Sequence, residues 1–185
     1  PLTALRGLIE PLRDGLVTSD EARSRYYDII LRETMRLSRL IDDLMALSRI
    51  QSGQMPIPIS TISLRELAED LGEKYRAAAE DKSLSFRLTF DPSACPPVES
   101  NADRVEQILV ILLDNAIKYT PPGGAIELGA RWDGDRVTMS VRDTGPGIAP
   151  ADQPHVFERF YKVDKSHSGL GSGLGLSIAR ELLRL

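Results

Sequence analysis

Apolar residues recur every three or four positions through the first fifty residues, with polar residues between them. This spacing predicts one helix over residues 1–16, which Pro11 would kink or weaken, and a longer one over residues 21–51 that Ser19 or Asp20 would cap. The apolar positions are Leu2, Leu5, Ile9, Leu12 and Leu16, then Ile30, Leu37, Leu40, Ile41, Leu44 and Leu47. Because a helical hairpin buries little surface alone, we expect two copies to pair as a four-helix bundle. Packing of the hairpin only on the chain's own second domain is the alternative.

After the hairpin, prolines at positions 56 and 58 predict an extended linker over residues 52–63. Helical and alternating patterns then follow one another. The predicted elements are a helix from Leu64 to about Asp81 capped by Ser63, a strand over 84–90, a loop over 91–100, a helix capped by Asn101, and strands over 125–132 and 136–142. We therefore predict an α+β fold, in which the hairpin precedes a two-layer α/β sandwich with a mixed sheet.

Composition excludes some functions. The chain has 185 residues, of which 42% are hydrophobic, and a net charge of −4. This acidic balance disfavours a nucleic-acid partner or a large contact with an anionic membrane. The single cysteine, Cys95, can form no internal disulfide and favours a cytoplasmic compartment. No apolar run reaches the ~18 residues of a membrane span.

Candidate binding chemistry lies at the end of the last predicted strand. Asp143 is followed there by Gly145, Gly147 and Ile148. A carboxylate can accept a hydrogen bond from an exocyclic amine such as that of adenine, and glycine lets a flat ligand approach the backbone. This pattern alone is more typical of a surface turn.

A second candidate group is Asn115, Lys118 and Tyr119, near the end of the preceding helix. The spacing of three residues places Asn115 and Lys118 on the same helix face. An amide oxygen can bind Mg²⁺, a lysine can bind phosphate, and a tyrosine ring can cover adenine. Without Asp143, the same residues would indicate only ordinary polar exposure.

A glycine-rich segment precedes a last helix that we expect to begin near Leu174. Its glycines are Gly169, Gly171, Gly173 and Gly175. Glycine-rich backbone at a helix start presents N–H groups to a phosphate. The segment 149–171 is predicted to be a mobile lid that Phe157 and Phe160 anchor on the core. It carries the basic residues Arg159, Lys162 and Lys165.

In this order, the segments resemble the nucleotide-binding domain of sensor histidine kinases. That domain is shared with gyrase, the ninety-kilodalton heat-shock chaperone and MutL-type repair proteins, the GHKL group. Residues 115–119 are similar to its N box, 143–148 to its first glycine box, 157–161 to its F box and 171–176 to its second glycine box.

The resemblance implies ATP and Mg²⁺ as ligands, and it implies a role for each candidate residue. Asn115 would bind Mg²⁺, Lys118 phosphate and Tyr119 the base, while Arg159 and Lys162 would hold the γ-phosphate. The implied catalytic residues are Asn115, Lys118, Arg159 and Lys162. The other implied nucleotide-binding residues are Asp143, Gly145, Gly147, Ile148, Gly171, Gly173, Leu174 and Gly175.

The hairpin resembles the dimerisation and phosphotransfer domain of the same kinases. Residues 1–4 are similar to the stretch that follows the motif His-Glu-Leu-Arg-Thr, and residues 33–44 to the second helix. The phosphoacceptor histidine would then lie five residues before Pro1, whereas His155 and His167 would be surface residues. We expect both ends to be cut and the last strands of the ATPase domain to lie beyond Leu185.

The expected domains are a partial hairpin over 1–51, the linker over 52–63 and an ATP-binding domain over 64–185. The resemblance implies a kinase that passes the γ-phosphate of ATP to the upstream histidine and on to an aspartate of a response-regulator receiver domain. It further implies a homodimer and a full-length sensor anchored in the membrane, with this part in the cytoplasm.

One position departs from the family pattern. Histidine kinases usually carry an asparagine four residues before Asn115, and gyrase-like proteins carry a water-activating glutamate; this chain has Ile111. Isoleucine can supply neither function, so the metal site would need Asp114 or water instead. Two other functions stay open: a hydrolytic ATPase, which Ile111 and the hairpin disfavour, and a non-catalytic dimeric scaffold with a degenerate site.

Overall fold

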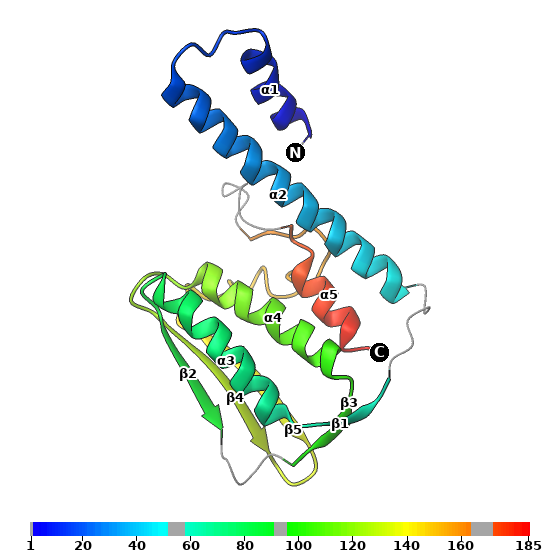
Figure 1. Ribbon diagram of the computed structural model, residues 1–185. Helices are drawn as coiled ribbons and strands as arrows, with labels where there is room; N and C mark the ends of the chain where they lie inside the picture. The colour runs from blue at the N-terminus through cyan, green and yellow to red at the C-terminus, as the bar shows by residue number, and fades with distance from the viewer. Residues whose placement is uncertain (1, 52–57, 91–95, 164–171) are drawn as a thin grey trace.

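The molecule consists of a helical hairpin and an α/β layer joined along one long helix (Figure 1). The computed structural model describes residues 2–51, 58–90, 96–163 and 172–185. The elements are α1 (Leu2–Arg13), α2 (Asp20–Gln51), β1 (Ser60–Ile62), α3 (Leu64–Glu80), β2 (Ser85–Phe90), β3 (Val98–Ser100), α4 (Ala102–Tyr119), β4 (Ala125–Trp132), β5 (Val137–Asp143) and α5 (Gly175–Leu182). Within this part of the chain, no helix has both the length and the hydropathy of a membrane span.

The hairpin forms as its apolar spacing predicts. Helix α1 continues through Pro11 and ends at Arg13, and Gly15 follows with a φ of +69°, which suits glycine. Ser19 caps α2, because the Ala22 N–H donates to its Oγ at 3.1 Å. Several apolar side chains of the hairpin remain exposed in the single chain, among them Leu2, Ile9, Leu31, Met35, Ile41 and Leu44.

A three-stranded mixed sheet forms the base of the second layer, as predicted. Strand β4 is central, with β2 parallel on one side and β5 antiparallel on the other. The parallel pair needs a crossover connection, and α4 lies within it. The register of β4 and β5 places Asp143 opposite Ile126, at the end of the sheet.

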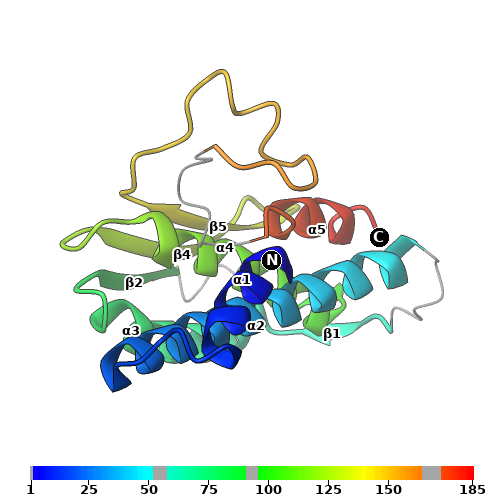
Figure 2. The ribbon, with the colours of Figure 1, turned by 90° about the horizontal axis from the view of Figure 1, so that it is seen from above.

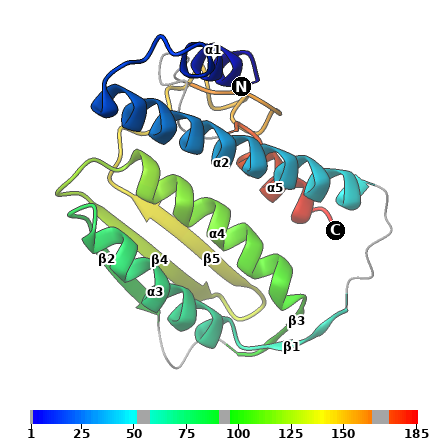
Figure 3. The ribbon, with the colours of Figure 1, turned by 45° about the horizontal axis from the view of Figure 1, so that its top comes forward.

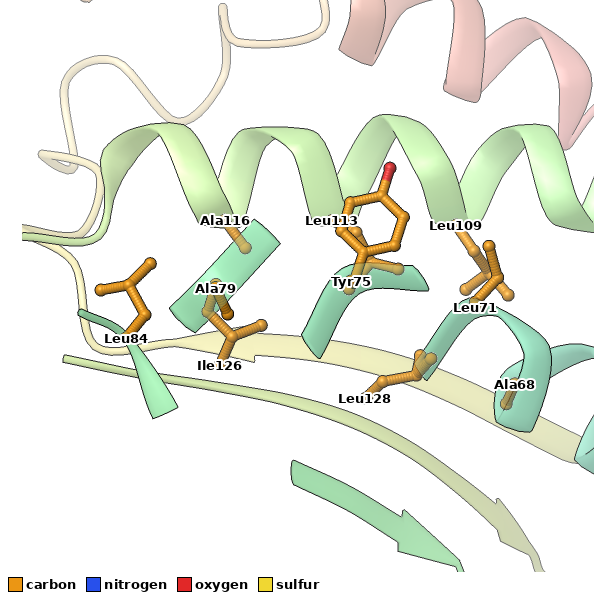
Figure 4. Packing of buried hydrophobic residues seen from close by; sticks show 10 residues of the cluster. All are labelled: Ala68, Leu71, Tyr75, Ala79, Leu84, Leu109, Leu113, Ala116, Ile126 and Leu128. Atoms are coloured by element: carbon orange, nitrogen blue, oxygen red, sulfur yellow. The ribbon is translucent and has the colours of Figure 1, made fainter. Parts of the chain in front are cut away.

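Helices α3 and α4 cover one face of this sheet (Figure 3), and their caps are those that the sequence predicts. The Ser63 side chain accepts from the Glu66 N–H, and Asn101 Oδ1 accepts from the Arg104 N–H at 3.0 Å. Figure 4 shows the core between helices and sheet. Its ten buried members are Ala68, Leu71, Tyr75, Ala79, Leu84, Leu109, Leu113, Ala116, Ile126 and Leu128.

Two short strands lie where the sequence predicts linker and loop. Strand β1 belongs to the segment 52–63 and β3 to the segment 91–100, and they pair antiparallel through three residue pairs. Three residues are too few for an alternating pattern to appear, so the predicted loop was wrong at residues 98–100, and the extended linker contains a paired strand that the sequence did not indicate. Residues 52–57 and 91–95, the latter with Cys95, lie outside the described residues.

The hairpin also packs on the α/β layer. Helix α5 lies between α2 and α4 in Figures 1 and 3, and it contacts both. Leu47 of α2 is only 3% exposed and clusters with residues of α5. The buried members are Leu47, Ile50, Leu174, Ile178 and Leu182. The hairpin therefore contacts its own second domain within one chain, which is one part of the alternative weighed above.

Candidate functional site

The end of β5 is shaped around the carboxylate of Asp143. One of its oxygens, Oδ1, accepts from the Gly145 N–H at 2.8 Å. A Cβ at position 145 would lie 2.7 Å from that oxygen and 3.1 Å from the Tyr119 carbonyl oxygen, so this turn requires glycine. A carboxylate has two oxygens, and the second can accept from a ligand amine.

A pocket of about 870 Å³ opens beside this turn. Tyr119 at the end of α4 and Thr144 and Gly145 after β5 line it, together with residues of the α3–β2 loop. Its full lining is Asp81, Lys82, Ser83, Lys118, Tyr119, Thr120, Pro121, Pro122, Thr144, Gly145 and Pro146. The volume and the mixture of a phenol ring with polar groups suit a ligand of nucleotide size.

Lys118 and Tyr119 lie against each other in the lining of this pocket. Lys118 Nζ donates to the Tyr119 hydroxyl at 2.7 Å and lies 4.3 Å from the centre of its ring. The ring is 53% exposed and therefore accessible to a flat ligand. Asn115, one turn earlier on α4, is partly buried and does not line the pocket.

Positive φ angles explain two of the predicted glycines. Gly147 has a φ of +72° and Gly173 a φ of +76°. At Gly173 there is also no room, since a Cβ would lie 2.9 Å from the carbonyl carbon of Phe160. The Phe160 N–H donates to the Gly173 carbonyl oxygen at 2.9 Å, which ties the F box to the second glycine box. Gly171 lies outside the described residues.

The segment 149–163 holds itself together by polar contacts and extends to one side of the molecule (Figure 2). The Tyr161 hydroxyl donates to Asp152 Oδ1 at 2.5 Å, and this hydrogen bond raises the pKa of the phenol. The phenylalanines do not anchor the segment on the core, contrary to the prediction: Phe157 is 41% and Phe160 63% exposed. The backbone bond to Gly173 ties the segment instead. Residues 164–171, with Lys165 and His167, lie outside the described residues.

The predicted basic residues of this segment differ in how far they are buried. Lys162 is partly buried, and its pKa is lowered, first by desolvation and then by the charges of Arg36 and Lys118. Arg159 is exposed. The positive charges of Lys118 and of Arg36 in α2 thus both reach Lys162, and sequence reasoning did not select Arg36.

The residues around Ile111 explain its departure from the family pattern. Ile111 packs against the cluster of α2 and α5, and its Cγ2 would lie 3.3 Å from a Cβ at position 175. Asp114, the other candidate metal ligand, accepts from the Tyr75 hydroxyl through Oδ1 at 2.7 Å on the side of α3. Among the described residues, no cluster of three or more His, Cys, Asp or Glu side chains could hold a metal.

The second half of the glycine-rich segment contacts α2. The Ser172 hydroxyl donates to Asp43 Oδ2 at 2.7 Å and accepts from the Leu174 N–H at 3.1 Å. The Leu174 side chain is 1% exposed in the apolar cluster, so only its backbone could reach a ligand. Gly175 begins α5, close to where the sequence predicts its start.

Sequence reasoning missed part of this site. Thr144 Oγ1 accepts from the N–H of Ala125, the first residue of β4, at 2.9 Å. Thr144 also lines the pocket. Its position between Asp143 and Gly145 was the signal available. Residues 81–83 line the pocket from a loop that carries no ligand-binding pattern.

Comparisons with known proteins identify the family of each half of the chain. Residues 1–53 match the family described as "His Kinase A (phospho-acceptor) domain". Residues 100–185 match the family described as "Histidine kinase-, DNA gyrase B-, and HSP90-like ATPase". The chain therefore belongs to the sensor histidine kinases of two-component systems and carries the core of such a kinase.

Individual relatives support the same assignment. Sensor protein SrrB of Staphylococcus aureus (strain NCTC 8325) is 32% identical over 185 residues, which are 99% of this chain and 31% of that protein. The chain thus spans about a third of the length of this relative. Histidine kinase AdeS of Acinetobacter baumannii has a TM-score of 0.77 and 25% identity, covering 100% of this chain and 83% of that one. Full-length ShkA in complex with AMPPNP has a TM-score of 0.72 and 28% identity, covering 89% and 34%.

Proposed function

We propose that this chain binds ATP and transfers its γ-phosphate to a histidine that precedes Pro1, from which a response-regulator aspartate receives it. The observation that carries the proposal is the pocket where Gly145, held by Asp143, meets Lys118 and Tyr119. The family assignment and the presence of AMPPNP on the related ShkA support the same ligand class.

The proposed roles follow from the chemistry of each side chain. Asp143 accepts the adenine amine and Tyr119 covers the base, while Lys118 and Lys162 hold phosphate oxygens. Asn115 would hold Mg²⁺ through its amide oxygen, and the ion would neutralise phosphate charge. The remaining proposed contacts come from the glycine boxes and Arg159: Gly145, Gly147, Ile148, Gly171, Gly173, the Leu174 backbone and Gly175.

The transfer itself needs little chemistry from the protein. A ring nitrogen of the acceptor histidine attacks the γ-phosphorus in line, the bond to the bridging oxygen breaks, and ADP leaves. Positive side chains stabilise the charge on the transferring group. Water activation of the gyrase type is disfavoured, because Ile111 is apolar and Asp114 is bonded to Tyr75.

The proposed domains are the hairpin over 1–51, the linker over 52–63 and the ATP-binding domain over 64–185. The exposed apolar side chains of the hairpin support pairing of two copies. Family membership supports a receiver domain as partner and a full-length, membrane-anchored sensor whose cytoplasmic part includes this chain.

Replacement of Asp143 by asparagine tests the adenine site. Asp143→Asn keeps an oxygen for the Gly145 N–H but presents an N–H where the adenine amine needs an acceptor. A mispaired buried polar group costs about 1–3 kcal/mol, so ATP affinity measured by calorimetry should fall roughly 5- to 150-fold. Asp135→Asn, in the exposed turn between β4 and β5, is the matched control and should change nothing. Equal affinities for all three proteins would remove Asp143 from the site.

A labelling experiment with γ-labelled ATP tests the transfer. This chain should bind ATP without becoming labelled, whereas a chain extended upstream through the His-Glu-Leu-Arg-Thr motif should form an acid-labile, base-stable phosphoprotein. Asn115→Ala should reduce the label sharply. Stable label at His155 or His167 would contradict the proposal. An extended chain that binds ATP and is never labelled would favour the scaffold.

A further inference from the structure

One face of α2 carries a regular stripe directed at the α/β layer. Its members follow one another at intervals of four, three, four and three residues, which keeps them on the same side of a helix. They are Arg36, Leu40, Asp43, Leu47 and Ile50. Leu47 and Ile50 are buried against α5, Leu40 packs beside them, and Asp43 accepts from Ser172. Arg36 is therefore the first member of a face whose other members all contact the ATPase half.

The position of Arg36 along α2 places it beyond the N-terminal end of α5. In Figures 1 and 3, α5 runs alongside the second half of α2 in the same direction. The segment that leads into α5 meets α2 at Asp43, through Ser172. Arg36 lies seven residues earlier, which is about 10 Å along the helix. The N-terminal end of a helix attracts anions, and here the proposed function places the phosphates of ATP.

Three cationic side chains, from α2, α4 and the segment 149–163, interact through their charges. The charges of Arg36 and Lys118 both act on Lys162, which is partly desolvated. Lys118 also lines the pocket, so it connects this group of charges to the proposed adenine site. Like charges held together repel each other, and an anion between them would remove that repulsion.

Arg36 is fixed in place but retains hydrogen-bonding capacity. Its Nη1 donates to Glu33 Oε2 at 3.2 Å, and both side chains are about four-fifths covered. Its Nε is buried and has no hydrogen-bond partner among the described residues. A guanidinium has five donors in a fork that matches phosphate oxygens, so Glu33 leaves donors for a second anion.

We propose that Arg36 of the hairpin binds the terminal phosphate of ATP, together with Lys118 and Lys162 of the ATPase half. This inference rests on the proposed function and extends it, because it makes the nucleotide site a composite of both halves of the chain. The hairpin would then distinguish a nucleoside triphosphate from a diphosphate before any transfer occurs.

Comparison of ATP with ADP isolates the terminal phosphate. In calorimetric titrations of the full chain with Mg²⁺, Arg36→Gln should weaken ATP binding by about tenfold or more, the effect of one charge-assisted hydrogen bond, and ADP binding by less than about twofold. Arg39→Gln is the matched control: Arg39 is exposed on another face of α2, with its Nε on the Met35 carbonyl oxygen, and should affect neither nucleotide. Arg36→Lys keeps the charge but loses the fork, so it should reduce the preference for ATP less.

The possible outcomes separate this inference from the proposed function. Wild-type protein that binds neither nucleotide would overturn both. Wild-type protein that binds both, with the same ATP-to-ADP affinity ratio after Arg36→Gln, would overturn only the role of Arg36. If Arg36→Gln does not fold by circular dichroism, the ratio for Arg36→Lys decides, and an unchanged ratio overturns the inference.

Discussion

Neighbouring side chains near the end of α4 point to different sides of the helix. Asp114 points toward α3, where the Tyr75 hydroxyl donates to it, whereas Lys118 and Tyr119 face the pocket. Figure 4 shows the Tyr75 ring among the buried residues, with its hydroxyl directed toward α4. Burial raises the pKa of Tyr75, and the hydrogen bond to Asp114 and the nearby negative charges of Asp114 and Glu106 raise it further.

The raised pKa of Tyr75 predicts a loss of stability in alkali. The folded protein holds the phenolic proton more tightly than the unfolded chain, whose tyrosines lose it near the ordinary pKa of about 10. Because the unfolded state then releases the proton first, the free energy of unfolding contributed by this group falls as pH rises above about 10. Tyr75→Phe should cost about 1 kcal/mol at pH 7 through the lost hydrogen bond, and less as pH rises.

Urea unfolding of wild type and Tyr75→Phe at pH 7, 10 and 11 measures this convergence. Tyr27→Phe, at a position 59% exposed, is the control and should remain close to wild type at every pH. A stability difference between wild type and Tyr75→Phe that stays constant from pH 7 to pH 11 would contradict the raised pKa.

At the scale of elements, the sequence predicts what depends on local signals. Ser19, Ser63 and Asn101 cap helices because their oxygens reach N–H groups three residues on, and this needs no tertiary contact. Strands β2, β4 and β5 are long enough for alternation to appear. Strands β1 and β3 are not, since each has three residues and depends on a partner far along the chain.

The candidate site also combines residues that local sequence signals predict with residues that only tertiary packing brings in. The motifs from Asn115 to Tyr119 and from Asp143 to Ile148 are each continuous, so their chemistry can be predicted from the sequence. The α3–β2 loop lines the pocket, and Arg36 faces the ATPase half, only as a result of folding. An arginine on an amphipathic helix gives no sign of what it faces, and the proposed role of Arg36 rests on the packing of later residues of the same helix face, Leu47 and Ile50, against α5. The exposure of Phe160 was mispredicted because a large apolar residue was assigned to the core without regard to its backbone, which has a φ of +64°.

At the scale of the whole molecule, the apolar residues left exposed on the hairpin predict a dimer. Leu44 is 54% exposed in the single chain, so Leu44→Glu should leave the fold of one chain intact while placing a charge in the proposed interface. Light scattering should give twice 20.4 kDa for wild type and 20.4 kDa for the variant. Leu183→Glu, at a position 72% exposed after α5, is the control and should remain dimeric. Equal masses for wild type and Leu44→Glu would exclude this face as the interface.

The apolar cluster between α2 and α5 has a consequence for how such kinases can be recombined. Its residues Leu47 and Ile50 belong to the part matched by one sequence family, and Leu174, Ile178 and Leu182 to the part matched by another. If the hairpin of one kinase were fused through the linker to the ATPase domain of another, each family match would stay complete. The α2 and α5 side chains that pack together would nevertheless come from different proteins. The residues of α2 and α5 that pack together must therefore be kept together, although they belong to two sequence families. A hairpin taken from another kinase would need α5 residues that match its own α2.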